Sequence, residues 1–150
     1  MNKVISVSLL LFVLCSIGYA IYKEAGSNNE QITPSQKSSN ITVYYFYSRV
    51  RCATCIKMEK YTEEAVKTGF SEMLEKGELV WAPTNIDEPQ NEIFIKKYRL
   101  HTKAVVISKN VEGKEVEWKN LDRIWELVRD KQSFTSYIKS ELNQFIGKSE

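Results

Sequence analysis

From residue 41 onward, short runs of β-branched and aromatic residues alternate with longer stretches in which apolar residues recur every three or four positions. Residues 41–47 (Ile-Thr-Val-Tyr-Tyr-Phe-Tyr) have the composition of a β-strand. Residues 53–69 place Met58, Tyr61 and Ala65 on one helical face. The pattern therefore predicts a strand that leads, after a few residues, into an amphipathic helix.

The rest of the chain continues this alternation and gives the order β-α-β-α-β-β-α. Pro83 falls within the second predicted strand, and since proline cannot donate a backbone hydrogen bond, we expect that strand at a sheet edge. Gly77 is expected to end the helical stretch that precedes it. The later elements are expected to be a helical continuation over 70–76, a strand over 79–86, a helix that opens at 87–89, strands over 104–108 and 115–118 with a turn at 110–114, and two final helices between 121 and 146.

Several apolar side chains outside the strands are expected in the core. In the helix after 87–89 the candidates are Ile93, Phe94 and Tyr98. The tryptophans are interpreted as core aromatics; they are Trp81, Trp118 and Trp125. The two final helices are striped by Leu121, Ile124, Trp125 and Val128, and by Phe134, Tyr137, Ile138, Leu142, Phe145 and Ile146.

Composition narrows the class of protein. Of 150 residues, 43% are hydrophobic and 11% aromatic, which is typical of a folded chain rather than a disordered one. The net charge is only +2, and acidic and basic residues are interspersed. Because no block of lysine and arginine is present, we expect no nucleic acid partner. The length allows one globular domain, which we place at residues 41–148.

The N-terminus indicates export. Residues 4–22 carry no charge over nineteen positions, close to the ~20 residues that span a bilayer, and Lys3 orients the N-terminus toward the cytoplasm. We expect residues 1–22 to be a transmembrane signal-anchor, with a signal peptide having small residues at 18–20 as the close alternative. Lipidation at Cys15 is disfavoured, because the preceding leucine is too large for a lipidation motif.

Whether residues 1–22 stay as an anchor, are cleaved as a signal peptide or are lipidated, the domain is delivered outside the cytoplasm. Residues 23–40 are polar and include glycine, proline and paired serines, so they are expected to form a flexible linker. The expected location is the bacterial periplasm or the outer face of the inner membrane, with the chain either membrane-anchored through residues 4–22 or secreted.

The candidate chemistry lies in Cys52-Ala53-Thr54-Cys55, between the first strand and the first helix. Cys52 is expected at the helix N-terminus, where unpaired N–H groups and the helix dipole favour a thiolate and lower the thiol pKa below about 8.5. Arg49 and Arg51 would lower this pKa further. Cys55, one turn later, is within disulfide reach and is expected to be covered, so Cys52 would attack and Cys55 resolve. A bridge closing two residues adds little stability, which favours chemistry over structure.

Across residues 41–146 the chain resembles thioredoxin-like proteins. The likeness is carried by the CxxC, by Asn85-Ile86-Asp87-Glu88 before a helix, and by Val105-Val106-Ile107 after a turn. It implies an α/β, three-layer fold with a mixed four-stranded sheet and the CxxC at the first strand–helix junction. More narrowly, residues 51–55 and 118–122 (Trp-Lys-Asn-Leu-Asp) are similar to small exported thioredoxin-like proteins of the ArsF family of nitrophenyl compound nitroreductase subunits.

The chain departs from the thioredoxin pattern at three places. His101-Thr102-Lys103 fills the loop in which most relatives carry a cis-proline that faces the CxxC and helps to bind substrate. Phe46 stands six residues before the first cysteine, where thioredoxins bury an acid, and Arg51 replaces the usual tryptophan. The resemblance places the 101–103 loop near the CxxC, so His101 is a candidate for stabilising the Cys52 thiolate or binding substrate, together with Thr102 and Lys103.

These observations predict an extracytoplasmic thiol–disulfide oxidoreductase. Cys52 and Cys55 would reduce or oxidise a disulfide of a partner protein, without a cofactor, and a membrane or exported redox partner would reset them. Two alternatives stay open. The dithiol could bind a soft metal such as Cu(I), which two thiolates suit. The domain could also be a non-catalytic thioredoxin-like subunit of a redox complex.

Overall fold

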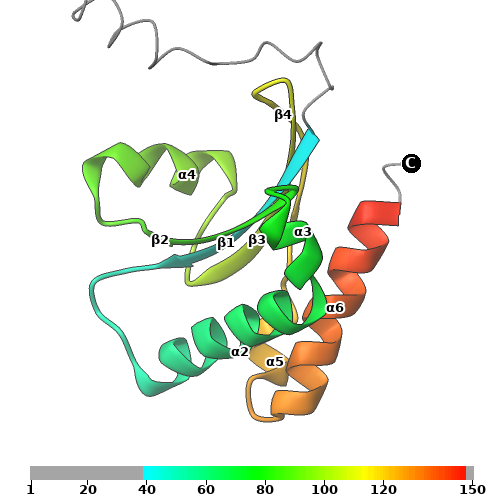
Figure 1. The fold of residues 1–150 in the computed structure, drawn as a ribbon. Helices are drawn as coiled ribbons and strands as arrows, with labels where there is room; N and C mark the ends of the chain where they lie inside the picture. Colours follow the sequence, from blue (N-terminus) through cyan, green and yellow to red (C-terminus); the bar gives the residue numbers. More distant parts are fainter. Residues whose placement is uncertain (1–38, 148–150) are drawn as a thin grey trace, which may run out of the picture. The chain divides into compact units, whose positions relative to one another are not determined.

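The computed structural model describes residues 39–147 (Figure 1). The expected membrane segment 1–22, and the expected linker apart from its last two residues, lie outside this range. Within the described residues, no helix combines the length and apolarity needed to cross a bilayer.

The predicted mixed four-stranded sheet is present, with strand order β2-β1-β3-β4 (Figure 1). Strands β1 and β2 are parallel, whereas β3 is antiparallel to both β1 and β4. Their bounds are Ser39–Tyr47 for β1, Leu79–Asn85 for β2, Ala104–Val111 for β3 and Lys114–Asn120 for β4. Strand β2 is an edge strand, as Pro83 predicts, and Pro83 lies opposite Tyr45 of β1. An edge strand has one unpaired side, so it tolerates a residue that cannot donate a backbone hydrogen bond.

The helices follow the predicted order. They are α2 (Ala53–Gly69), α3 (Ser71–Glu75), α4 (Glu92–Lys97, after a 3-10 turn at Pro89–Asn91), α5 (Ile124–Leu127) and α6 (Lys131–Gly147). Gly77, just after α3, has a φ of +72°, a left-handed conformation that glycine adopts without steric cost, so the predicted helix stop is confirmed. The β3–β4 hairpin turns through Glu112 and Gly113, both with positive φ.

Two cores lie on opposite faces of the sheet and give the three layers. On β1, alternate residues Ile41, Val43 and Tyr45 face the large core that α2 and α6 cover, whereas Phe46 belongs to a smaller cluster on the side of α4 (Figure 1). Each fully buried large apolar side chain contributes roughly 1.5–3 kcal/mol, so the larger cluster supplies most of the stability. The α/β fold with a thioredoxin-like order of strands is therefore the predicted one.

Some burial predictions are wrong. Ile93 is 66% exposed, since a six-residue helix turns only one side, with Phe94, toward the sheet. The exposed fraction is 38% for Trp118 and 41% for Trp125, and Trp81 is only partly buried. The stripe that contains Trp125 forms a helix of four residues, too short to bury one continuous face.

Four of the connecting loops leave the sheet at the same edge, where the strands end or begin. Tyr47 at the end of β1 lies opposite Asn85 at the end of β2, and Ala104 at the start of β3 pairs with Phe46. Asn120 at the end of β4 pairs with Val106, close to the start of β3. The loops after β1, β2 and β4 and the loop before β3 therefore all leave the sheet at this edge.

Candidate active site

Cys52 and Cys55 are joined by a disulfide at the start of α2. Their Cα atoms lie 5.1 Å apart, a spacing at which two cysteines can be bridged without moving the backbone. The predicted positions of both residues, immediately after β1 and in the first turn of the following helix, are observed.

Cys52 is the N-cap residue of α2. Its backbone is extended (φ −86°, ψ 162°), and its sulfur accepts a hydrogen bond of 3.2 Å from the Cys55 N–H. Because the first N–H groups of a helix lack backbone acceptors, they stabilise a negative charge on a sulfur in this position once the disulfide is reduced. The geometry favours a Cys52 thiolate.

The two cysteines differ in access. Cys52 is exposed, whereas Cys55 is buried, with only 2% of its surface accessible to solvent. A partner disulfide can therefore approach the sulfur of Cys52 from solvent, while Cys55 can be reached only from inside the motif. This asymmetry is the one that the roles of attacking and resolving thiol require.

Tyr45 of β1 contacts the CxxC motif from the protein interior. Its fully buried hydroxyl donates a 2.7 Å hydrogen bond to the carbonyl oxygen of Cys55. Burial raises the pKa of Tyr45 to about 12, a rise that the charge of Arg51 reduces in part. Tyr45 therefore stays a neutral donor at physiological pH and holds the first turn of α2 against β1. Phe46, the residue at the usual acid position, points to the other face.

Arg51 is held beside the motif by two contacts. Its guanidinium lies 4.2 Å from the centre of the Tyr47 ring and forms an ion pair with Glu59 of α2. The charge of Arg51, which was expected to favour the Cys52 thiolate, is therefore shared with Glu59. Arg49 is linked instead through its backbone, whose N–H donates to Asp87 after β2 at 2.7 Å.

The candidate substrate residues lie just before β3. His101 and Thr102 are exposed, and Lys103 is half-buried. Cys52 is bonded to Cys55 here and carries no thiolate, so stabilisation of that thiolate by His101 stays a prediction. All peptide bonds of the described residues are trans, including those of this loop.

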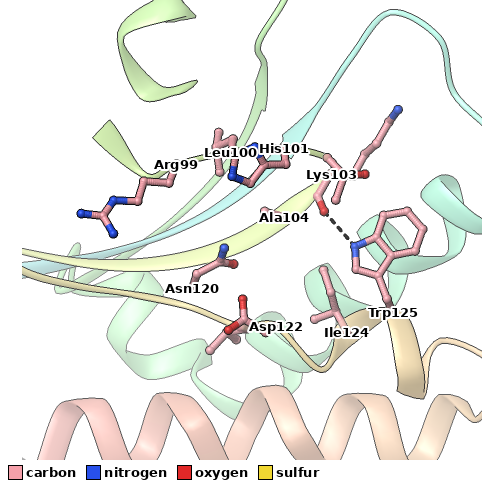
Figure 2. Close-up of a pocket in the computed structure, with 11 residues that line it drawn as sticks. Arg99, Leu100, His101, Lys103, Ala104, Asn120, Asp122, Ile124 and Trp125 are labelled. Carbon is pink, nitrogen blue, oxygen red and sulfur yellow. Dashed lines mark hydrogen bonds between the residues drawn. The ribbon is translucent and has the colours of Figure 1, made fainter. Parts of the chain in front are cut away.

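The structure groups these three residues in a pocket of about 170 Å³ (Figure 2). The pocket lies between the loop before β3 and the segment after β4. Its walls include the apolar side chains Leu100, Ala104, Leu121 and Ile124, and its polar and aromatic residues are Arg99, His101, Thr102, Lys103, Asn120, Asp122 and Trp125. Neither cysteine lines it, so the sheet edge presents the dithiol and this pocket as separate features.

Two residues of the site were missed by sequence reasoning. Trp125 was assigned to the core, but its indole N–H donates to the Lys103 carbonyl at 3.1 Å (Figure 2). Tyr45 was recognised only as part of a strand. The period-two alternation of β1, which puts Tyr45 on the face of α2, could have indicated its role. No local signal in the sequence indicates the contact of Trp125.

The described residues offer few donors for a resident metal. Within residues 39–147, no group of three or more histidine, cysteine or acidic side chains could hold an ion. The dithiol itself supplies two soft ligands once it is reduced, and these are the residues that a Cu(I)-type site would use.

Comparisons with known proteins complete the description. No protein-family model matches the chain, and no curated protein matches it. Among solved structures, the oxidised thioredoxin of Plasmodium falciparum is 15% identical with a TM-score of 0.39, covering 66% of this chain and 85% of its own. Fasciola hepatica thioredoxin is 22% identical with a TM-score of 0.37, covering 65% of this chain and 81% of its own.

The zinc-bound form of human ERp44 is also similar, with 17% identity and a TM-score of 0.43; the match covers 75% of this chain and 29% of that one. Scores of this size carry no argument about activity. The thioredoxin-like assignment therefore rests on the strand order, the connectivity and the position of the CxxC disulfide at the first strand–helix junction.

Proposed function

We propose that this chain is an extracytoplasmic thiol–disulfide oxidoreductase that acts on a disulfide or dithiol of a partner protein. The observation that carries the proposal is the asymmetric disulfide: an exposed Cys52 at the N-cap of α2, bonded to a buried Cys55. A bridge that encloses two residues gives little conformational stabilisation, so a disulfide at this helix start is best explained by exchange chemistry.

In the reducing direction, the Cys52 thiolate attacks one sulfur of the partner disulfide. A mixed disulfide forms, and the other partner sulfur leaves as a thiolate and takes up a proton. The Cys55 thiolate then attacks Cys52, which releases the second partner thiol and restores the Cys52–Cys55 bond. Two electrons pass from the dithiol to the partner. The oxidising direction is the same sequence reversed.

The cycle needs a second partner that resets the dithiol. We propose a redox protein of the membrane or the exported compartment, because residues 4–22 are apolar enough in sequence to anchor the chain or to direct its export. An anchor would confine both proteins to one plane and raise their effective concentration.

The ArsF resemblance supports an alternative, in which the domain is a subunit of a nitrophenyl compound nitroreductase. It rests on residues 51–55 and 118–122. The first stretch holds the dithiol, and the second runs from β4 into the pocket wall at Asp122. We place thiol–disulfide exchange first because the dithiol supplies that chemistry without a further group.

Insulin reduction, with dithiothreitol as the electron donor and a chelator present, tests the proposal. We expect the wild-type chain to accelerate the reaction and Cys52→Ser to abolish the acceleration. Cys55→Ser should also be inactive. When it is reduced beforehand and mixed with insulin after removal of the dithiothreitol, it should accumulate a mixed disulfide through Cys52, visible on a non-reducing gel. Equal rates for wild type and Cys52→Ser would refute exchange, and activity that disappears with the chelator would favour a metal site.

A further inference from the structure

Trp125 has an unusual position for a tryptophan. It lies in the short helix α5 with 41% of its surface exposed, although its ring is the largest apolar side chain of that segment. Its indole N–H reaches across 22 positions of sequence to the carbonyl oxygen of Lys103, at 3.1 Å (Figure 2). The hydrogen bond therefore links α5 to the loop before β3.

The group that Trp125 contacts belongs to a loop with few other restraints. Residues 101–103 are exposed or half-buried bends between α4 and β3, and the loop is entered through Arg99, whose φ of +52° is left-handed. The far end of the loop is secured at Ala104, which pairs with Phe46. Between these points, the Trp125 hydrogen bond is a tertiary tie to α5.

The same hydrogen bond shapes the pocket. Lys103, from the loop before β3, and Trp125, from α5, both line the pocket, and their hydrogen bond joins these two segments (Figure 2). Ala104, which ends that loop, pairs with Phe46 near the end of β1, so the loop and the CxxC segment leave the sheet at the same edge. A partner that reaches Cys52 from this edge would therefore approach the loop as well.

We propose that Trp125 is a positioning residue for partner binding: its indole N–H holds the Lys103 carbonyl and so fixes the 101–103 loop and the pocket against which the partner docks. This inference rests on the proposed exchange function. It concerns binding of a protein disulfide and leaves the attack of Cys52 on a small disulfide unaffected.

The test uses the full chain in mild detergent and the variant Trp125→Phe, which keeps an aromatic ring but removes the N–H. Trp118→Phe is the matched control, because Trp118, on β4, has a similar exposed fraction of 38% but packs against Tyr98 at the end of α4. Insulin serves as the protein disulfide and glutathione disulfide as the small one. We expect Trp125→Phe to lower kcat/KM for insulin about two- to tenfold, mainly through KM, and to leave glutathione disulfide unchanged.

Hydrogen–deuterium exchange gives a second readout that does not depend on activity. Amides of residues 101–104 should exchange faster in Trp125→Phe than in wild type or Trp118→Phe. Unchanged exchange and unchanged KM would overturn the proposal, as would equal losses with both disulfides, which a general disturbance of the fold produces. If the wild type and Cys52→Ser are equally inactive, the proposed thiol–disulfide exchange is wrong, and the docking role is wrong with it. Faster hydrogen–deuterium exchange of residues 101–104 in Trp125→Phe would then still show that the Trp125 hydrogen bond restrains the loop.

Discussion

At the scale of single residues, the site depends on how β1 and the start of α2 are joined. Cys55 is buried and its carbonyl receives the Tyr45 hydroxyl, whereas Cys52 stays exposed at the helix end. The charge of Arg51 beside them is shared with Glu59 and the Tyr47 ring. The motif is therefore held rigidly on its inner side and left accessible on its outer side.

The variant Tyr45→Phe tests this support. Removing the hydroxyl should lower the free energy of unfolding by about 1 kcal/mol near neutral pH, because one buried hydrogen bond is lost. The pKa of Tyr45 is raised from 10.0 to about 12, so the folded chain holds this proton more tightly than the unfolded chain. The stabilising contribution is therefore complete below pH 10 and disappears as the pH rises toward 12.

Urea unfolding followed by circular dichroism from pH 7 to pH 11.5 measures this difference. The deficit of Tyr45→Phe relative to wild type should shrink above pH 10, and Tyr47→Phe, altered at a partly exposed tyrosine of the same strand, serves as the control. A deficit that stays constant over the whole range would show that the hydroxyl is not buried and protonated as described.

At the scale of elements, a polar network joins α4 to the β3–β4 hairpin, on the face of the sheet that carries the smaller apolar cluster. The carboxylate of Glu115 on β4 accepts hydrogen bonds from the Ser108 hydroxyl at 2.5 Å and from the Tyr98 hydroxyl, and it pairs with Lys97 at 3.0 Å. Ser108 is fully buried, so its hydroxyl depends on this acceptor. The network secures the helix that precedes the 101–103 loop.

The variant Glu115→Gln should destabilise the fold by about 1–2 kcal/mol at pH 7, since charge-assisted hydrogen bonds are replaced by neutral ones. Burial by itself would raise the pKa of Glu115, but the hydrogen bonds from Ser108, Tyr98 and Lys97 bring it below its ordinary value of 4.5. A lowered folded-state pKa means that this stabilisation is present above pH 4.5 and is lost as the pH falls through the lowered value.

Thermal unfolding of wild type and Glu115→Gln between pH 3 and pH 7 follows this loss. The difference between the two should shrink as the pH falls below 4.5, because the unfolded wild-type chain then binds a proton that the folded chain binds less readily. Glu117→Gln, exposed on the same strand, should differ little from wild type at any pH. A difference for Glu115→Gln that persists unchanged at pH 3 would contradict the assigned network.

The elements were largely predictable because their signals are local. β-branched and aromatic runs gave the strands, Gly77 gave a helix end, and Pro83 gave the edge strand. The exposure of Ile93, Trp118 and Trp125 was not predictable, because it depends on which helix covers which part of the sheet. Apolar composition alone does not contain that information.

The candidate site divides in the same way. The CxxC spacing and its position between strand and helix predicted the disulfide and the difference in access between Cys52 and Cys55. The contacts of Tyr45 with Cys55 and of Trp125 with Lys103 join residues 10 and 22 positions apart. Contacts of this kind arise from the pairing of strands and the packing of short helices, and no local pattern specifies them.

At the scale of the whole molecule, the arrangement brings four connections to one edge of the sheet and leaves the exposed cysteine among them. The proposed anchor at residues 4–22 would deliver this edge to the exported compartment. A membrane-impermeant maleimide applied to intact, reduced bacterial cells should therefore label the dithiol of a Cys15→Ala chain. Labelling only after lysis would place the domain in the cytoplasm and contradict the proposed location.

The most direct measurement of the central claim is the equilibrium of the Cys52–Cys55 bond with glutathione. The full chain carrying Cys15→Ala would be equilibrated in metal-free buffers of defined glutathione ratio, and the free thiols counted after alkylation. The account predicts a reversible two-electron couple within about −120 to −270 mV. A couple well below about −300 mV would show a structural bridge, and failure to form the disulfide while one soft metal ion stays bound would show a metal site; either result would contradict the proposed function.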